Sequence, residues 1–299
     1  IDSEGIVVDT DGNFWICEEG GPTIWKLNPQ GVVLKRFTPY AKLSGAQSQD
    51  VLIDTVFKYR KNNRGFEGIS ITPNGKIYAI IQSPLLYPTT NTGENTQIHR
   101  LLEINPVNNS TRVFAYLNEG IIGTAGPDQI RLRDWKIGDM AAVNDHEFLL
   151  IEAGARGGSD VKKIFKIDIT HATPVNAGLY GGKTLEGLKD ATGLDTNKIV
   201  PVSKTLFLDL LASGWKSSLD KSEGLAIVND STVAVGNDND YGQSCPAADG
   251  IAIATSVRSH IFIFGLKGSN KLVNYVLPPS FSPEINLTGN NETINDGDT

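Results

Sequence analysis

The chain has 299 residues, of which 39% are hydrophobic and 8% aromatic, and it contains 31 glycines. This composition is too apolar for a disordered chain and suits short strands joined by tight turns. The formal net charge of −7 argues against a nucleic-acid partner, because proteins that bind nucleic acid usually present a basic surface. No stretch approaches about 18 consecutive apolar residues, so no membrane span is predicted.

One pattern recurs along the chain: an acidic residue, usually followed by glycine, then an apolar run, a polar turn, a second apolar run and a polar cluster. Its four copies begin at Glu4, Glu67, Asp139 and Glu223. The runs 6–8 and 69–71 are short and rich in β-branched residues, and the turns Asp11-Gly12 and Asn74-Gly75 are typical of hairpins. Each copy therefore predicts a β-hairpin.

A third apolar run follows each hairpin, at 23–27, 99–104, 163–167 and 260–264. A fourth run, such as 32–37, follows the first three of them. Four antiparallel strands repeated in tandem predict an all-β fold, a β-propeller, because radial repetition leaves only short, protected sheet edges. We expect five or six four-stranded blades, with at least one built partly from sequence upstream of Ile1, where the chain already reads as the middle of a domain.

Residues 1–277 are thus predicted to form the propeller, without an upstream blade. Polar insertions at 40–63, 185–195 and 210–220 lengthen the repeats and are expected to hold short helices. Residues 278–299 are rich in Pro, Asn, Thr and Gly and lack the blade pattern, which favours a linker or the start of a following domain.

Only two cysteines, Cys17 and Cys245, occur in the chain. They form either one disulfide or two buried thiols, and the sequence leaves both possibilities open. No spacing of Cys and His residues indicates a zinc site.

In a propeller the first strand of each blade lines the central channel, so the four acids that open the repeats should surround one mouth of it. The polar ends of the adjacent strands return to the same mouth. Converging carboxylates repel one another unless a cation neutralises them, and calcium prefers oxygen ligands of this kind. The candidate calcium ligands are Glu4, Glu18, Glu67, Asp139, Glu223, Asp238 and Asp240.

Two alternatives remain open for these acids. Each acid of an acid–glycine pair could instead hydrogen-bond backbone amides of the next blade. The segment 237–240, which has only part of a calcium-loop pattern, could form an Asx turn.

Two arginines, Arg64 and Arg156, stand near the acidic clusters, and a planar guanidinium suits bidentate phosphate binding. The alternative for each arginine is a surface salt bridge. No nucleophile motif is present, so a metal-activated water is the favoured nucleophile. The candidate catalytic residues are Arg64, Arg156, Glu19 and Glu152.

A set of motifs carries a resemblance to a known family. They are Asp-x-Glu-Gly-Ile from Asp2 with Phe-Trp-x-x-x-Glu-x-Gly-Pro from Phe14, Asn-Arg-Gly-Phe-Glu-Gly from Asn63 with Gln-Ser-Pro-Leu, and Glu-Gly-Leu from Glu223 followed by Asn-Asp-Asn-Asp. From Asp2 to Leu266 the chain resembles the phytase-like, or "esterase-like activity of phytase", family. The resemblance implies a bacterial extracytoplasmic β-propeller, often of the calcium-dependent phosphatase or phytase kind.

The chain departs from the family pattern in two places. The first blade is missing, which leaves closure of the ring open, and the third repeat has Asp139-Met140 with Glu152-Ala153-Gly154.

Two functions are therefore predicted for a secreted, periplasmic or cell-surface protein. The first is a calcium-dependent phosphoesterase that acts on a phosphorylated small molecule by metal-activated water. The alternative is a non-catalytic, calcium-stabilised module whose partners are other surface-protein modules. A lactonase-type or other metal-dependent hydrolysis is a further possibility on this fold.

Overall fold

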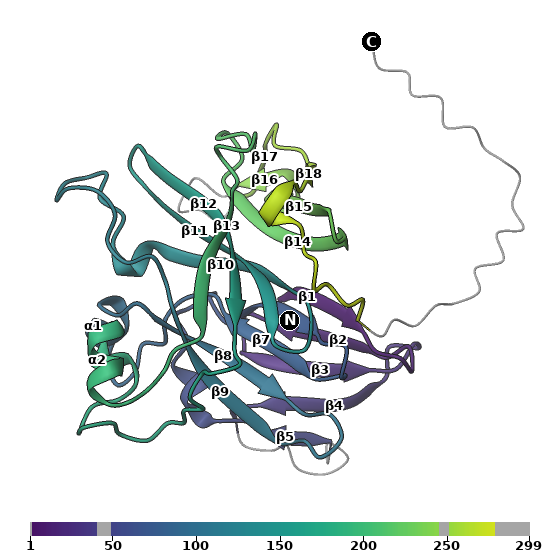
Figure 1. Cartoon of the computed structure of the whole chain (residues 1–299), viewed down its shortest axis with the longest axis vertical. Helices are drawn as coiled ribbons and strands as arrows, with labels where there is room; N and C mark the ends of the chain where they lie inside the picture. The colour runs from purple at the N-terminus through teal and green to yellow at the C-terminus, as the bar shows by residue number, and fades with distance from the viewer. Residues whose placement is uncertain (1, 41–48, 245–250, 279–299) are drawn as a thin grey trace, which may run out of the picture.

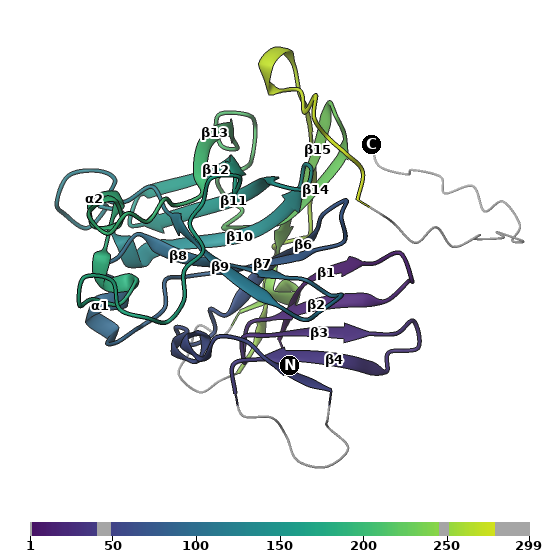
Figure 2. The ribbon, with the colours of Figure 1, turned by 60° about the horizontal axis from the view of Figure 1, so that its bottom comes forward.

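The computed structural model describes residues 2–40, 49–244 and 251–278, which form an all-β structure (Figure 1). Four sheets follow one another along the chain and are arranged like the blades of a propeller (Figure 2). The predicted fold class is therefore confirmed. The expected five or six blades are not confirmed, because the described residues form four.

The first two blades have the predicted order of strands. Blade 1 contains β1 (Ser3–Val8), β2 (Phe14–Glu18), β3 (Thr23–Leu27), β4 (Val33–Thr38) and, parallel to β4, β5 (Asp50–Leu52). Blade 2 contains β6 (Phe66–Ile71), β7 (Ile77–Ile81), β8 (Ile98–Ile104) and β9 (Thr111–Leu117). Within each blade, neighbours along the chain are neighbours in the sheet.

Blades 3 and 4 continue the arrangement. Blade 3 contains β10 (Trp135–Ala142), β11 (Glu147–Arg156), β12 (Ser159–Asp168) and β13 (Ser203–Asp209). Blade 4 contains β14 (Lys221–Asn229), β15 (Thr232–Asp238) and β18 (Ile261–Gly265), while β16 (Gln243–Ser244) and β17 (Ile253–Ala254) form a separate pair. The inner strands pack in chain order, β1 on β6, β6 on β10 and β10 on β14.

The connections hold short helices. They are α1 (Thr90–Glu94), α2 (Ala191–Thr196) and the 3-10 helices η1 (Thr55–Tyr59), η2 (Leu132–Asp134), η3 (Glu186–Leu188), η4 (Asp240–Gly242) and η5 (Gly268–Asn270). The helices expected within 40–63 and 185–195 are present, whereas 210–220 forms turns and loops. None of the helices in the described segments is long and apolar enough to span a membrane.

The core consists of layers of side chains between successive blades. In β2, Trp15 and Cys17 are buried against blade 2, whereas Phe14 and Ile16, which alternate with them, are partly exposed, which is the period of two that a strand imposes. Tyr78 of blade 2 and Phe148 of blade 3 meet with ring centroids 4.7 Å apart. These layers hold the blades at fixed positions, and so hold the inner strands around the channel.

The buried Cys17 thiol donates a hydrogen bond to the Glu67 carbonyl oxygen, with Sγ and O 3.3 Å apart. Burial raises the pKa of this thiol well above its ordinary value. Cys245 and most of the predicted linker, 279–299, lie outside the described residues.

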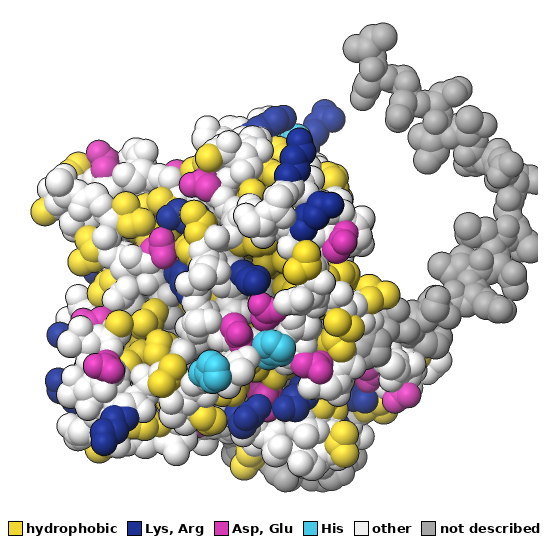
Figure 3. All heavy atoms as spheres, viewed as in Figure 1, with side chains coloured by type: hydrophobic (Ala, Val, Ile, Leu, Met, Phe, Trp, Pro, Cys, Tyr) yellow, Lys and Arg dark blue, Asp and Glu magenta, His cyan; other side chains and the backbone are white. Residues whose placement is uncertain are grey.

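On the face shown in Figure 3, acidic and basic side chains are interspersed, with hydrophobic side chains scattered among them. No single sign of charge dominates that face.

Glycines allow the inner strands to approach one another. A Cβ atom added to Gly138 in β10 would lie 2.1 Å from the Ser222 carbonyl oxygen in β14, and one added to Gly68 would lie 2.8 Å from the Met140 amide nitrogen. Real Cβ atoms do not come so close to backbone atoms, so a side chain at either position would push two blades apart.

The substitution Gly138→Ala is expected to lower the free energy of unfolding by about 2 to 3 kcal/mol, because the backbone of β14 would have to move. Gly224→Ala is the matched control, since the atoms nearest to its added Cβ belong to Gly236 and lie 3.6 Å away or more. Urea denaturation of both variants measures the difference. Equal destabilisation by the two substitutions would contradict the proposed close contact between β10 and β14.

Candidate functional site

A cavity of about 830 Å³ opens at one mouth of the channel. All four blades contribute to its wall: Glu4 and Glu19 from blade 1, Glu67 from blade 2, Lys136 from blade 3 and Glu223 from blade 4. The convergence of the repeated acids that the sequence suggested is therefore present for Glu4, Glu67 and Glu223.

A β-bulge places each of these acids in the wall. Phe66 pairs with Ile81 and Gly68 with Ile80, so Glu67 is an extra residue without a partner on β7. Glu223 is extra in the same way between Ser222 and Gly224. A bulge redirects the side chain of the inserted residue, and here it presents the carboxylate to the cavity.

In blade 3 the bulged residue is not an acid. The extra residue is Gly138, because Ile137 pairs with Glu152 and Asp139 pairs with Ile151. The Asp139 carboxylate instead accepts hydrogen bonds from the backbone amides of Met140 and Leu225, both at 2.7 Å. Burial raises the pKa of Asp139 to about 7. The expected ring of four acids is thus wrong at Asp139, which binds backbone amides, one of them in the next blade.

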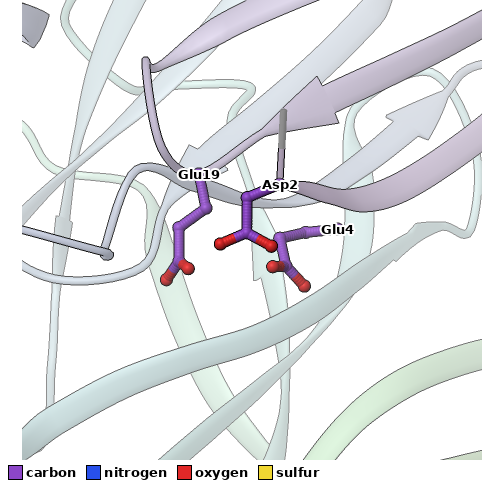
Figure 4. A group of neighbouring side chains, drawn as sticks. All are labelled: Asp2, Glu4 and Glu19. Atoms are coloured by element: carbon purple, nitrogen blue, oxygen red, sulfur yellow. The ribbon is translucent and has the colours of Figure 1, made fainter. Parts of the chain in front are cut away.

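The closest group of acids comprises Asp2, Glu4 and Glu19, which each offer a carboxylate oxygen within 4.8 Å of the others (Figure 4). Sequence reasoning did not select Asp2. Asp2 lies two residues before Glu4, and residues two apart in an extended segment point to the same face. This spacing could have identified Asp2 as a member of the group.

Glu67 lies beside this group and is the most deeply buried acid of the cavity, with 3% of its surface exposed. Its Oε2 atom has no hydrogen-bond partner among the described residues. Burial, and then the negative charges of Glu223, Glu4 and Glu19, raise the pKa of Glu67 to about 10. An unpaired, buried carboxylate oxygen is unfavourable unless a proton or a cation neutralises it.

The pKa values of the neighbouring acids are raised as well. Burial, followed by the charges of Glu4 and Asp2, raises the pKa of Glu19 to about 8. Burial raises the pKa of Glu223 to about 7, although Lys221 opposes the shift. The cavity therefore disfavours the charged form of its carboxylates, and a bound cation would relieve that cost.

Glu18 does not share in this group. Its carboxylate accepts hydrogen bonds from the backbone amides of Asp2 at 3.1 Å and Gly21 at 2.6 Å, and from the Thr23 hydroxyl at 3.4 Å. Glu18 thus holds the turn after β2 in place rather than facing the cavity.

Asp238 and Asp240 lie in the cavity wall but already have a cationic partner. The Lys221 Nζ atom is 2.7 Å from Asp238 and 2.6 Å from Asp240, and it is 3.9 Å from Glu223. The Asp240 amide donates to the Asp238 carboxylate at 2.8 Å, which is the Asx turn given as the alternative to a calcium loop. Lys221 was missed because sequence spacing does not show which side chains meet across a hairpin.

Glu152 and Arg156 lie away from the cavity. Glu152 is fully buried and accepts hydrogen bonds from the Tyr116 hydroxyl, the Glu119 amide at 2.7 Å and Lys204 at 2.7 Å. Arg156 donates to the carbonyl oxygens of Gly126 and Gln129. Both residues belong to the packing of blade 3.

The register of the hairpins explains this separation. Glu18 and Glu152 occupy equivalent positions, paired with Ser3 and Ile137. The position one residue later faces the cavity at Glu19 in blade 1 and an adjoining cavity at Ala153 in blade 3. Because successive side chains of a strand point to opposite faces, an acid one place earlier points away from the mouth.

Cations complete the wall of the cavity. Arg64 donates from Nη1 to the Ser83 hydroxyl at 3.0 Å, and burial lowers the pKa of its guanidinium. Lys61 and Lys136 line the cavity with it. In the described part of the chain, none of these three side chains forms an ion pair with a carboxylate, so they are available to an anionic ligand.

Several known proteins share features with this chain. The PorZ surface component of the type-IX secretion system of Porphyromonas gingivalis aligns with 80% of this chain and 24% of its own, at a TM-score of 0.39 and 12% identity. Virginiamycin B lyase of Staphylococcus aureus aligns with 90% of this chain and 71% of its own, at a TM-score of 0.30 and 13% identity. Neither likeness is close enough to carry an argument.

The sequence comparisons are more informative. An "Uncharacterized secreted protein" of Arthroderma benhamiae is 33% identical over 102 residues, which cover 28% of this chain and 20% of that protein. The chain thus spans about a fifth of that relative. A family model described as "Phytase-like: Esterase-like activity of phytase" matches residues 1–241, which is most of the sequence. The chain therefore belongs to the phytase-like family.

Proposed function

We propose that this chain is the propeller domain of an extracellular, calcium-dependent phosphoesterase. The observation that carries the proposal is Glu67, a buried carboxylate with an unpartnered oxygen, which faces three clustered acids in a cavity that also holds unpaired cations. A site for a cation beside a site for an anion is what metal-assisted hydrolysis of a phosphoester requires. The extracellular location rests on the secreted relative.

The donor set suits calcium. Asp2, Glu4, Glu19 and Glu67 offer only carboxylate oxygens, and the nearby Glu223 adds another. Hard cations prefer such oxygens, whereas zinc sites draw on His and Cys, which do not line this cavity. We assign Glu19 to this metal site rather than to a separate catalytic role, since its carboxylate lies within the cluster.

Three cationic side chains of the cavity would bind the phosphoester. Arg64 can bind a phosphoryl group through two parallel hydrogen bonds, and Lys61 and Lys136 add positive charge next to it. Bound calcium would lower the pKa of a coordinated water. Hydrolysis adds the oxygen of water to phosphorus and breaks the ester P–O bond, and a proton lost by the water passes to the leaving group, which departs as the alcohol; Arg64 would hold the phosphoryl oxygens in this step.

Release of inorganic phosphate from a panel of phosphomonoesters tests the proposal. We expect release with calcium, none with a chelator, and a loss of about 100-fold or more in Arg64→Ala. The matched control is Arg156→Ala, because Arg156 contacts backbone carbonyls away from the cavity. Calcium-independent release, or an equal loss in both variants, would contradict the assignment.

A non-catalytic, calcium-stabilised module remains the second candidate, and an exposed apolar surface favours it. In blade 4, Ile261, Ile263 and Val228 are 75%, 63% and 55% exposed. Their alternate neighbours Phe262 and Phe264 pack towards blade 3. In this second reading, another module of the protein packs on this apolar face. Calcium-dependent stabilisation without phosphate release would favour this second candidate.

A further inference from the structure

The candidate site is built on two turns that belong to different blades. Residues 18–21 (the acid turn) lie at the end of β2 and carry Glu19, whereas residues 61–64 (the cation turn) precede β6 and carry Lys61 and Arg64. Blades 1 and 2 are separate sheets, so no strand pairing sets the distance between the two turns. Contacts outside the sheets must therefore hold the acids and the cations at a fixed separation.

Each turn is held together internally. In the acid turn, the Glu19 amide donates a hydrogen bond to the Asp2 carbonyl oxygen at 3.0 Å, which keeps two acids of the cluster side by side. In the cation turn, the Arg64 amide donates to the Lys61 carbonyl oxygen at 3.1 Å, and the two residues form an antiparallel β-bridge. The distance that remains to be fixed is the one between the two turns.

Arg60, directly before the cation turn, reaches the acid turn. Its Nε atom is 2.6 Å from the Gly20 carbonyl oxygen, and its Nη2 atom donates to the same oxygen. A guanidinium usually pairs with a carboxylate or a phosphate, but within the described residues Arg60 forms no ion pair. The Arg60 side chain therefore links the residue before Lys61 to the residue after Glu19.

The main chain of Arg60 is anchored to buried residues. At the end of η1, the Arg60 amide donates to the Phe57 carbonyl oxygen at 3.3 Å. The Phe57 side chain is fully buried and contacts Phe66 of β6, with ring centroids 5.0 Å apart. The Tyr59 carbonyl oxygen accepts the Leu86 amide at 2.7 Å. Because its base is fixed to the core, Arg60 can hold the acid turn in position instead of following its movements.

Gly65, directly after the cation turn, makes a second contact with the acid turn. A Cβ atom added to Gly65 would overlap the Glu19 carbonyl oxygen and would lie 2.8 Å from the Glu19 Cα atom. The Gly65 carbonyl oxygen accepts the Gln82 amide at 2.8 Å, which fixes Gly65 to the residue after β7. The two main chains therefore pack directly against each other, with no space for a side chain between them.

We propose that Arg60 is a positioning residue, which holds the cation turn at a fixed distance from the acid turn through the Gly20 carbonyl oxygen. Arg60 is not among the described residues that line the cavity, so it would affect a ligand only through the two turns. Because coupling between two binding sites is reciprocal, this contact should let calcium at the acids favour an anion at Arg64, and the reverse. The inference rests on the proposed function and adds a residue that no motif of the sequence indicated.

Calorimetric titration of Arg60→Ala with calcium, and then with methylphosphonate in the presence of calcium, tests the inference. We expect both affinities to fall about tenfold, because residues that orient metal ligands typically contribute this much. A purely electrostatic role predicts the opposite sign for calcium, since removal of a positive charge beside the acids would tighten its binding. An unchanged or higher calcium affinity in Arg60→Ala would overturn the inference.

Arg156→Ala is the matched control for this substitution. Arg156 also donates to two backbone carbonyl oxygens, but it lies away from the cavity. Its replacement should leave both affinities unchanged. Equal losses in Arg156→Ala and Arg60→Ala would contradict a positioning role for Arg60.

Gly65→Ala disturbs the contact between the two turns without changing any charge. The added methyl group would push the Glu19 main chain away, so we expect both affinities to fall about tenfold, as in Arg60→Ala. Gly265→Ala is its control, since no atom of the described residues, its chain neighbours apart, lies within 4 Å of the added Cβ atom. Melting temperatures show which variants fold, and full affinity in a folded Gly65→Ala would overturn the inference.

Hydrogen exchange of the ligand-free protein provides a readout that needs neither calcium nor turnover. In Arg60→Ala we expect the amides of Glu19, Gly21 and Arg64 to exchange about tenfold faster, because these hydrogen-bonded amides lie in the two turns that would separate. The amides of β8 and β9 should exchange as in the unmodified protein. Unchanged exchange in both turns would overturn the inference. If the unmodified protein binds no calcium, the proposed phosphoesterase is refuted, and hydrogen exchange alone decides the role of Arg60.

Discussion

The substitution Glu67→Gln is expected to weaken calcium binding by about 100-fold or more and to abolish calcium-dependent stabilisation. The buried Glu67 carboxylate has an oxygen, Oε2, without a hydrogen-bond partner among the described residues, and glutamine has the same shape without the charge. The metal-free variant should be as stable as the unmodified protein, because Glu67 is protonated at neutral pH when its pKa is about 10. Calcium titration by calorimetry and melting temperatures measure both effects.

Glu152→Gln is the matched control for this substitution. Glu152 is also a buried glutamate, but it has Lys204 as its cationic partner, and its replacement leaves Lys204 with only the Glu119 carboxylate, 3.2 Å away. It should lower the melting temperature and leave the calcium response intact. Unchanged calcium binding in Glu67→Gln would refute the proposed metal site.

The metal-free protein is expected to lose stability as the pH rises from about 7 to about 8, and calcium should reverse this dependence. The pKa values of Glu67 and Glu19 are raised to about 10 and about 8, so the folded protein retains protons that the unfolded chain has already lost. The free energy of unfolding then falls by about 1.4 kcal/mol per pH unit for each retained proton.

Asp139 and Glu223, whose pKa values are both raised to about 7, contribute to the loss of stability with the same sign. The pKa of buried His99 is lowered to about 3, so His99 affects stability only below the pKa of an unfolded histidine, about 6.5. Calcium replaces the retained protons and binds more tightly as the pH rises. Urea denaturation at both pH values, with chelator and with calcium, measures the two slopes. A metal-free stability that is constant or rises with pH would contradict the assigned pKa shifts.

Much of the fold could be predicted from the repeated pattern. The runs 23–27 and 163–167 lie in β3 and β12, because alternating β-branched and aromatic residues between turn residues favour strands in any surroundings. Helices α1 and η2 were not predicted, since such short segments depend on tertiary contacts more than on local propensity. The number of blades was not confirmed, because a repeat pattern does not state how many units close a ring.

The candidate site, like the fold, could be predicted from the sequence only in part. The convergence of Glu4, Glu67 and Glu223 could be predicted, because repeats that form equivalent blades place equivalent residues around one axis. Asp139, Glu18 and Glu152 were assigned to the site, although the structure places them in hydrogen bonds elsewhere. Each of these acids fits the sequence pattern as well as the cavity-facing residues do.

The sequence by itself therefore determined the family, the four-stranded unit and the acidic end of the channel, since these follow from local periodicity and repetition. The tertiary structure decided which acids face the cavity, which cation neutralises Asp238 and Asp240, and where the unpaired Arg64 and Lys136 lie. A single bulged residue moves each later side chain of its strand to the opposite face of the sheet. Ion pairs across a hairpin in turn depend on that register rather than on spacing along the chain.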